Sequence, residues 1–496
     1  AHDLADTYLP QFEAVVREGK VAGIMAAYNR VNGSACVANT ELLGTVLRRQ
    51  WGFDGFVVGD CGAVQDLVSG HGVARDEVHA AALALRAGTD LDCGRGYRYL
   101  TRAVAAGLVT EKEVDAAAAR LFTVRFRLGL LDGLPAKVTT SVSDHSALAR
   151  EAAQKSLVLL ENDGVLPIAS GVRRIAVVGP VADDVNVLLG NYHGEPGAPI
   201  TLLAGIRTAA ARRGITVDHA PGVALTGRSL GQLPQAVAAA RAADLVIATL
   251  GMSPLLEGEA DDPDGVNAEG DRSDLGLPGA QGALLSALLR TGKPTVVVLT
   301  GGSAIALPVG GDARPRAVLM AWYPGEQGGG AVADALFGDV APSGRLPVTF
   351  YRSVAQLPPF DDYAMAGRTY RYFEGQPLYP FGHGLRYAPV SYGPLAVTAE
   401  TSGVTMESVV ENRGDRSVDE VVQVYAAARP RQPGDPRRAL IAFRRVTLPP
   451  HQQQAIRFDL PRASFSRVDD AGHRQPASGT WEITLGDRTA AVTLGD

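Results

Sequence analysis

Hydrophobic and polar positions alternate between strand-like and helix-like spacing along the first 131 residues. Val21–Tyr28 and Phe56–Val58 are short apolar runs that predict buried strands, and Thr89–Cys93 has the composition of a third strand end. Thr40–Gln50 and Arg75–Ala87, which lie between these runs, carry apolar residues at helical spacing. This alternation predicts a parallel sheet with right-handed crossovers, although three strands cannot close a barrel.

A helix predicted around Ala147–Leu159 leads into a second region, where β-rich runs alternate with Ala-rich helices. The pattern is typical of a doubly wound sheet. The turn after its first strand lacks G-x-G-x-x-G, which argues against a dinucleotide site. The predicted strands are Arg174–Val178, Leu245–Leu250, Thr295–Thr300 and Ala317–Ala321.

From about Tyr387 the helical spacing gives way to period-two alternation. Met406–Val410, Glu420–Ala426 and Thr480–Gly486 are strand-like stretches separated by Gly, Pro and Asn-Arg-Gly turns. A region of roughly 100 residues with this pattern predicts a β-sandwich. The chain length fits about three domains. We place their boundaries at 1–131 (first α/β region), 132–160 (linker and connecting helix), 161–360 (second α/β region), 361–386 (linker) and 387–496 (β-sandwich).

Composition and charge exclude several classes of protein. Of the 496 residues, 46% are hydrophobic and 20% charged, as in ordinary globular proteins. The net charge is −6 without a long run of one sign, so we expect neither a nucleic acid nor a membrane as a partner. No segment reaches the roughly 18 consecutive apolar residues of a membrane span. The N-terminus has neither an initiator Met nor a signal-peptide pattern, which suggests a segment of a longer protein.

The cysteines give no sign of a metal site. Cys36, Cys61 and Cys93 form no C-x-x-C spacing, and we expect neither a metal nor another cofactor. One disulfide with a remaining thiol and three reduced thiols are both compatible with the sequence.

Carboxylates after two buried strands are the candidates for chemistry. Asp60 directly follows Phe56–Val58, at the sheet edge where barrel enzymes place their catalytic groups, unless it caps a helix or starts a turn. The acidic loop from Gly251 to Arg272 follows another buried strand. Hydrolysis of a glycoside needs two carboxyl groups flanking one bond, but such a loop can also be a solvated surface.

Several long segments carry a resemblance to a known family. They are Asp3–Pro10, Met25–Gly33, Gly55–Asp60, Ser156–Pro167, Trp322–Gly329, Phe337–Phe350, Tyr370–Leu385, Glu411–Gly414 and Asp419–Tyr425. With these segments the chain resembles family 3 of the glycoside hydrolases, the β-glucosidase and β-xylosidase group, from its first residues to its last. The resemblance implies an α/β multidomain fold: the C-terminal part of a (β/α)8 TIM barrel, an α/β sandwich domain and a fibronectin type III-like β-sandwich.

The resemblance also implies a mechanism, which is retaining hydrolysis by double displacement. Asp60 matches the nucleophile, and it would lie about 5–5.5 Å from the acid/base carboxyl. Glu259, in the sequence Glu257-Gly-Glu259, is the favoured acid/base. An insertion of about ten residues, by comparison with the family pattern, separates it from Asp271-Arg272. Glu269, which is close to that pair, and Glu257 are the rivals.

Substrate expectations rest on residues near the nucleophile. Met25 and Tyr28 match family positions that contact the sugar, with core packing as the alternative. Cys61 stands where many β-glucosidases of the family have Trp, which favours the β-xylosidase and arabinofuranosidase branch and leaves β-glucosidase as the alternative. An oligosaccharide or aryl glycoside would be the substrate, and the resemblance implies a periplasmic or secreted protein. The oligomeric state stays open.

The chain also departs from the family. The early barrel strands of the family have no counterpart in this sequence. In the family they carry a Lys-His pair, an Arg and an Asp that bind the sugar hydroxyls. By the family pattern Asp60 would follow the seventh strand, so about five of the eight strands of a barrel would be absent. We therefore expect an N-terminally truncated chain that is poorly active by itself. A non-catalytic carbohydrate-binding homologue is the alternative.

Overall fold

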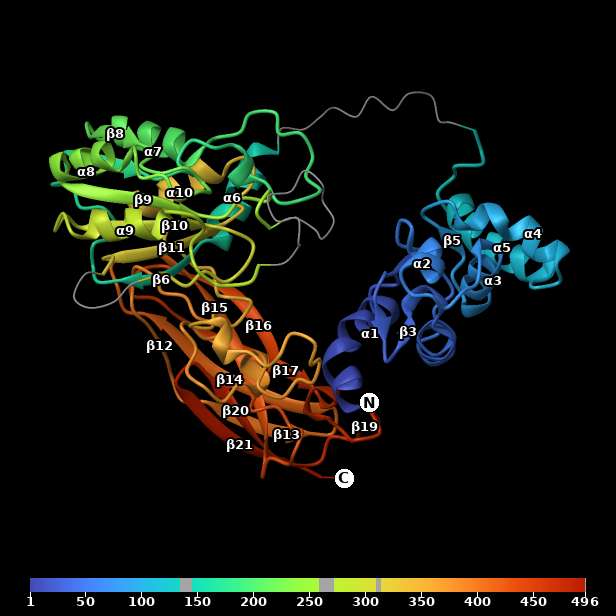
Figure 1. Cartoon of the computed structure of the whole chain (residues 1–496). Coiled ribbons are helices and arrows are strands. Elements are labelled where there is room, and N and C mark those ends of the chain that lie inside the picture. The colour runs from blue at the N-terminus through green and yellow to red at the C-terminus, as the bar shows by residue number, and fades with distance from the viewer. Residues whose placement is uncertain (134–144, 258–271, 309–313, 496) are drawn as a thin grey trace. The chain divides into compact units, whose positions relative to one another are not determined.

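A computed structural model describes residues 1–133, 145–257, 272–308 and 314–495 of the chain (Figure 1). The chain divides into two compact units, Ala1–Val142 and Ser143–Asp496. The division of the chain into five segments, predicted from the sequence, stays a prediction.

The first unit contains a three-stranded parallel sheet in the order β1-β4-β5, formed by β1 (Gly23–Ala26), β4 (Phe56–Gly59) and β5 (Leu91–Asp92). Ala26 pairs with Gly59, and Gly59 pairs with Asp92, so all three strands end at one edge. The predicted strand–helix alternation is confirmed. Helices and shorter elements surround this sheet: η1 (Leu4–Tyr8), α1 (Pro10–Arg17), β2 (Arg30–Val31), β3 (Ser34–Ala35), η2 (Cys36–Ala38), η3 (Glu41–Gln50), α2 (Ala63–Ser69), α3 (Glu77–Ala87), η4 (Gly96–Tyr99), α4 (Leu100–Ala105) and α5 (Glu111–Arg127).

The two helices predicted in this unit are present with small differences. The helix predicted over 40–50 is η3, which has the wider i→i+5 bonding of a π-helix, as in the bond from Trp51 N to Val46 O of 3.1 Å. The helix predicted from Arg75 begins at Glu77, because Asp76 adopts an extended backbone and caps it by accepting from His79 N at 2.9 Å.

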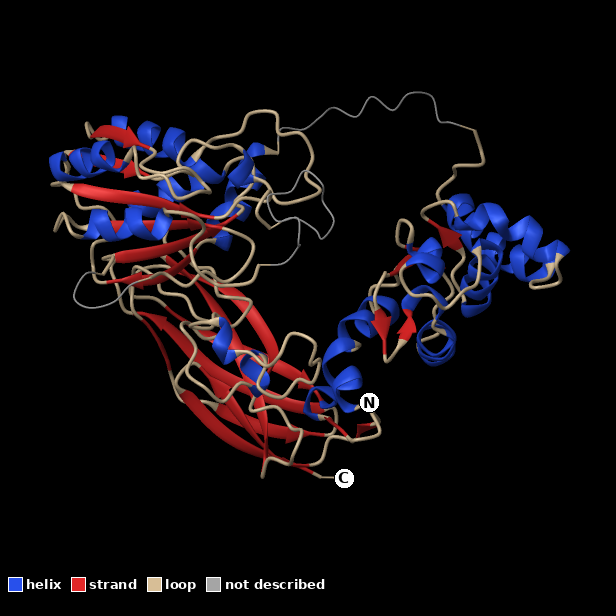
Figure 2. Ribbon diagram, viewed as in Figure 1, coloured by secondary structure: helices blue, strands red, loops and turns tan. Residues whose placement is uncertain are grey.

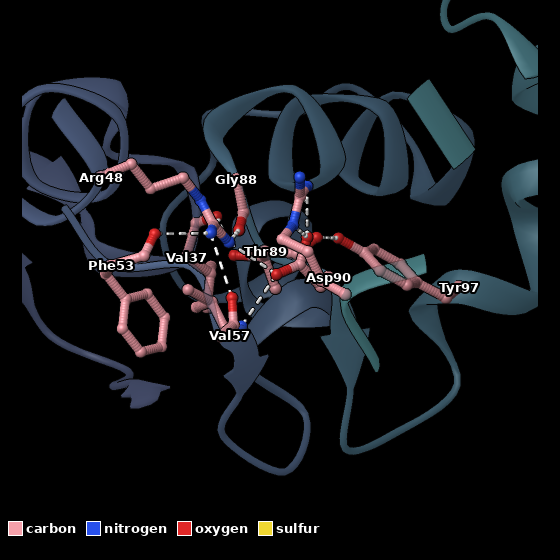
Figure 3. A network of polar contacts seen from close by, with 10 residues as sticks. Val37, Arg48, Phe53, Val57, Gly88, Thr89, Asp90 and Tyr97 are labelled. Carbon is pink, nitrogen blue, oxygen red and sulfur yellow. Dashed lines mark hydrogen bonds and ion pairs between the residues drawn. The ribbon is translucent and has the colours of Figure 1, made fainter. Parts of the chain in front are cut away.

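A buried carboxylate ties the helices of the first unit to its sheet (Figure 3). The side chain of Asp90 is 1% exposed and pairs with Arg48 of η3 and Arg120 of α5, each at 2.7 Å. Its Oδ2 also accepts from Val57 N at 2.9 Å, inside β4. Tyr97 donates to the carbonyl of Thr89, and its pKa is raised by burial and by the nearby charge of Asp90. This network fixes the strand that precedes Asp60.

The second unit begins with a six-stranded sheet in the order β6-β11-β10-β9-β7-β8. All neighbouring pairs are parallel except β6 with β11. Its residues alternate between two cores: Ile175 and Val177 pack with helices α7 and α10, whereas Ala176 and Val178 pack with α8 and α9. Figure 2 shows helices on both sides of this sheet. The strands are β6 (Val158–Asn162), β7 (Arg174–Val178), β8 (Thr216–Ala220), β9 (Leu245–Gly251), β10 (Thr295–Thr300) and β11 (Ala317–Trp322).

The sequence-based prediction of this sheet was right for four strands and missed two. The helix predicted over 147–159 ends earlier, as α6 (Ser146–Ser156), because residues 158–162 form β6 along β11. The edge strand β8 was not predicted. The other helical elements of the sheet domain and the segment after it are η5 (Asn186–Leu188), α7 (Leu202–Ala211), α8 (Leu233–Ala242), α9 (Gln281–Leu289), α10 (Gly328–Phe337), η6 (Val354–Gln356) and α11 (Thr369–Tyr372).

The C-terminal part of the second unit is a β-sandwich, as predicted. One sheet has the order β12-β14-β13 with β17 also paired to β14, and the other has the order β16-β15-β20-β21. Its core contains Val424, Phe465 and Trp481. The elements are β12 (Val390–Tyr392), β13 (Ala396–Glu400), β14 (Gly403–Asn412), β15 (Val418–Arg429), β16 (Ala439–Leu448), β17 (Gln453–Pro461), η7 (Arg462–Phe465), β18 (Arg467–Val468), β19 (Arg474–Gln475), β20 (Gly479–Leu485) and β21 (Arg488–Leu494).

Within the described ranges, no helix combines the length and the apolar character needed to cross a membrane.

Candidate active site

Asp60 lies at the carboxyl edge of the three-stranded sheet, directly after β4. Its backbone N donates to Ala26 O at 2.9 Å, and its Oδ1 accepts from Cys61 N at 2.7 Å. The next helix, α2, has Gly62 as its N-cap and no side-chain capping bond. Asp60 therefore does not cap this helix, but it does start a turn, because Ala63 N donates to Asp60 O at 3.0 Å. Its partly exposed carboxylate stands at the end of the strand, as the sequence predicted.

A disulfide joins the loop after Asp60 to the loop after β5. It links Cys61 to Cys93, and Cys36 is the buried free thiol, whose pKa is raised by burial. Two backbone bonds reinforce the link: Gly62 N donates to Cys93 O at 2.7 Å, and Cys93 N donates to Gly59 O at 3.2 Å. The sequence allowed either one disulfide with a free thiol or three reduced thiols, and the structure has the first of these states. The disulfide and these two hydrogen bonds hold the loop that carries Asp60 against the loop after β5.

Met25 and Tyr28, the two predicted sugar contacts, are exposed side chains of the first unit. Met25 is 55% and Tyr28 is 42% exposed in this chain. Met25 borders an apolar cavity of about 270 Å³. The hydroxyl of Tyr28 lies 3.8 Å from where a Cβ on Gly62 would stand, next to the Asp60 loop. Their role as sugar contacts stays a prediction.

Glu257 is the only one of the three candidate acid/base residues that the described ranges contain; Glu259 and Glu269 lie outside them. Glu257 follows β9, and its carboxylate accepts from Gly302 N at 2.7 Å, from the Ser303 hydroxyl and from the Tyr323 hydroxyl. A Cβ on Gly302 would stand 3.3 Å from this carboxylate, so glycine permits the close approach of the backbone.

Arg272 completes this group, which we call the Glu257 cluster (Glu257, Arg272, Ser303 and Tyr323). Its Nη1 lies 3.7 Å from Glu257 Oε1, with both side chains 13% exposed, and donates to Ser303 Oγ at 2.7 Å. The pKa of the Tyr323 phenol is raised by burial, by its hydrogen bond to Glu257 and by the charge of that carboxylate. The phenol therefore stays protonated and keeps donating.

Sequence reasoning missed Ser303 and Tyr323. Ser303 follows β10, which pairs with β9, and Tyr323 follows β11, which pairs with β10. The register pairs Gly251 with Thr300 and Thr300 with Trp322. The three strand ends therefore coincide, at the edge where doubly wound sheets bind ligands. The signal was a polar residue soon after each buried strand, but only the sheet order shows which strand ends are neighbours.

Within the described residues, no group of three or more His, Cys, Asp or Glu side chains could hold a metal ion.

Comparison with protein families matches three parts of the chain. Residues 1–124 match the glycosyl hydrolase family 3 N terminal domain, and residues 157–387 match the glycosyl hydrolase family 3 C-terminal domain. Residues 420–489 match the fibronectin type III-like domain.

Individual relatives cover nearly the whole chain. A β-xylosidase of Formosa agariphila is 33% identical over 99% of this chain and 71% of its own length. The structure of a β-glucosidase from Erythrobacter marinus is 35% identical, with a TM-score of 0.89 over 98% of this chain and 69% of its own. An exo-β-xylosidase, XlnD, in complex with a xylobiose aziridine activity-based probe is 30% identical, with a TM-score of 0.90 over 100% of this chain and 68% of its own.

Proposed function

Because the chain belongs to family 3 of the glycoside hydrolases, we propose that it hydrolyses terminal, non-reducing β-linked sugars as an exo-acting retaining enzyme. Its fold is that of the family: barrel strands, an α/β sandwich domain and a fibronectin type III-like domain. The observation that carries the mechanism is the carboxylate of Asp60, which stands at a strand end, caps no helix and lies on a loop held by a disulfide.

Asp60 is the proposed nucleophile. Its carboxylate would attack the anomeric carbon and form a covalent glycosyl-enzyme while the leaving oxygen takes a proton from the acid/base. Water then attacks the same carbon, giving up its proton to the acid/base carboxylate, and Asp60 is released. Two such displacements leave the sugar with its original β configuration.

Glu259 is the proposed acid/base, and the surroundings of Glu257 support this choice. Glu257 already accepts bonds from Gly302, Ser303 and Tyr323 and has Arg272 beside it. A general acid needs to carry a proton and point it at the leaving oxygen. A carboxylate that already accepts several hydrogen bonds is better suited to anchoring a loop. Glu259, only two residues further along the chain, is therefore the proposed acid/base.

Xylose is the proposed sugar. Cys61 takes the position of the Trp found in many β-glucosidases of the family, and the disulfide keeps that short side chain turned to Cys93. Relatives bearing the names β-xylosidase and β-glucosidase both match the chain, so β-glucosidase is the second candidate. The expected substrate is a xylo-oligosaccharide or an aryl β-xyloside.

Trapping with a mechanism-based inhibitor tests the proposal. The protein would be incubated with an activated 2-deoxy-2-fluoro-β-xyloside or the matching glucoside, digested, and examined by mass spectrometry. We expect a fluoroxylosyl ester on Asp60, slower labelling by the glucoside, and no label on Asp60→Ala. Faster labelling by the glucoside would favour the second candidate. Absence of label on Asp60 with both reagents would instead favour a non-catalytic carbohydrate-binding protein.

A further inference from the structure

The second unit contains a cavity away from the Glu257 cluster. Its volume is about 450 Å³, within the range of small-ligand sites. It lies where the segment around Tyr370–Phe381 covers strands β15 and β20 of the β-sandwich. We call it the arginine cavity, after the four arginines among its lining residues: Arg429, Arg431, Arg437 and Arg438.

Two of these arginines already have carboxylate partners. Arg429 pairs with Glu482 at 2.6 Å, and Arg431 pairs with Glu374 at 3.3 Å. All four of these side chains are substantially exposed, so these pairs are weak and open to exchange with a ligand.

The other two arginines have no carboxylate within ion-pair distance among the residues that the structure describes. Arg437 donates to the carbonyl of Phe373, and Arg438 lies with its guanidinium carbon 4.4 Å from the ring centroid of Tyr425. The four guanidinium groups are therefore paired with only two carboxylates, although the chain as a whole has a net charge of −6. The cavity keeps positive charge that is not neutralised locally, and it is suited to an anion.

The walls of the arginine cavity include aromatic rings, which suit a ligand with a C–H face, such as a sugar ring. Tyr370 and Phe381 stack at 4.0 Å between centroids and 15° between planes. The Tyr370 hydroxyl is held by Leu440 N at 2.9 Å, so this wall is fixed in place. Aromatic walls with a few placed charges are typical of sites for small organic molecules rather than for bare inorganic ions.

We propose that the arginine cavity binds an acidic sugar, a hexuronate unit carried on an oligosaccharide. Guanidinium groups pair with carboxylates through two parallel hydrogen bonds, which Arg437 and Arg438 could offer to the uronate. The proposal rests on the proposed function only for the choice of a saccharide over another organic carboxylate. Such a site would hold a charged branch of a substrate polymer while the neutral chain end is cleaved elsewhere.

Calorimetry with matched ligands tests this site. The titrations use the Asp60→Ala protein, so that the result is independent of turnover and of the proposed nucleophile. We expect a xylo-oligosaccharide with one glucuronate branch to bind at least about tenfold more tightly than the unbranched oligosaccharide. This preference should shrink as NaCl is raised. Equal affinity for the two oligosaccharides, or no binding of either, would overturn the proposal, and acetate binding as tightly as the branched ligand would overturn its saccharide part.

Two variants locate the binding site. Arg437→Ala/Arg438→Ala should abolish the preference for the branched ligand. Arg444→Ala is the control, because Arg444 also lies over an aromatic ring, 4.7 Å from the centroid of Phe458, but does not line the cavity. Thermal unfolding of both proteins checks the fold. If the double variant is destabilised, the single Arg437→Gln variant, which leaves Arg438 over Tyr425, replaces it. A preference unchanged in a folded variant, or lost equally in Arg444→Ala, would place the ligand elsewhere.

Discussion

Two carboxylates follow buried parallel strands in this chain, and their surroundings differ. Asp60 accepts a hydrogen bond from the neighbouring Cys61 N and is partly exposed after β4. Glu257 is 13% exposed after β9 and accepts from Gly302, Ser303 and Tyr323. Under the proposed function, the same position at a strand end would hold a reactive group in one case and anchor a loop in the other. The number of donors around the carboxylate, rather than its place in the sheet, distinguishes the two proposed roles.

Removing the carboxylate of the proposed nucleophile, Asp60, should have the largest effect. Asp60→Ala should lower kcat for an aryl β-xyloside by at least ~10⁴-fold, because no covalent intermediate can form. Rates would be measured with the full-length protein. Asp66→Ala on α2, a few residues along the same segment, is the control and should stay within a few-fold of the parent. Comparable losses in the two variants would show a structural effect and remove the distinction made for Asp60.

Chemical rescue should separate the anchor from the acid/base. Glu259→Ala should lose about 10²–10⁴-fold in activity, the usual contribution of general acid–base catalysis. Azide should restore activity and give a β-xylosyl azide, because a small nucleophile can replace the water that Glu259 activates. Glu257→Ala should lose activity without rescue. The azide product appearing with Glu257→Ala, and not with Glu259→Ala, would reverse the two assignments.

The first unit should depend on its buried carboxylate for stability. Asp90→Asn leaves Arg48 and Arg120 without their shared charge partner, so we expect a loss of about 3–5 kcal/mol in the free energy of unfolding. Denaturant unfolding followed by fluorescence measures the loss. Asp54→Asn, in the same unit and exposed, should change stability by less than about 0.5 kcal/mol. A similar small change for Asp90→Asn would mean that the network does not hold β4.

The smallest effect concerns the Glu257 cluster. Tyr323→Phe removes one donor from Glu257 and should cost about 1–2 kcal/mol of stability. It should also lower kcat, because the anchor of the acidic loop is loosened. Tyr387→Phe is the matched control, since its part-buried hydroxyl donates to Ala335 O at 2.7 Å far along the chain from the cluster. It should lose similar stability and keep kcat; equal kcat in both variants would contradict the anchoring role.

The sequence predicts those strands whose burial is indicated by a local run of apolar, β-branched residues. β10 was predicted to the residue, because Thr295–Thr300 is a fully buried β-branched run. β6 was missed, since its apolar residues continue the pattern of the preceding helix, and only pairing with β11 makes them a strand. The edge strand β8 was missed because Thr216–Ala220 includes Asp218 and His219, which a half-buried edge tolerates.

The site was predictable to a similar extent. The place of Asp60 followed from one strand and its end. The partners of Glu257 did not, because Ser303 and Tyr323 reach it only through the order β9-β10-β11. The pairing of Cys61 with Cys93 likewise needs β4 and β5 to be neighbours, which no spacing in the sequence reveals.

The disulfide beside Asp60 has a practical consequence for preparing the protein. Cystines form in oxidising compartments and are rare where glutathione and thioredoxin keep thiols reduced. Material made in a reducing cytosol would carry three thiols, Cys36, Cys61 and Cys93, and could cross-link wrongly during purification. Production with export, or oxidative refolding that leaves Cys36 untouched, would deliver the cystine form in which the Asp60 loop is tethered.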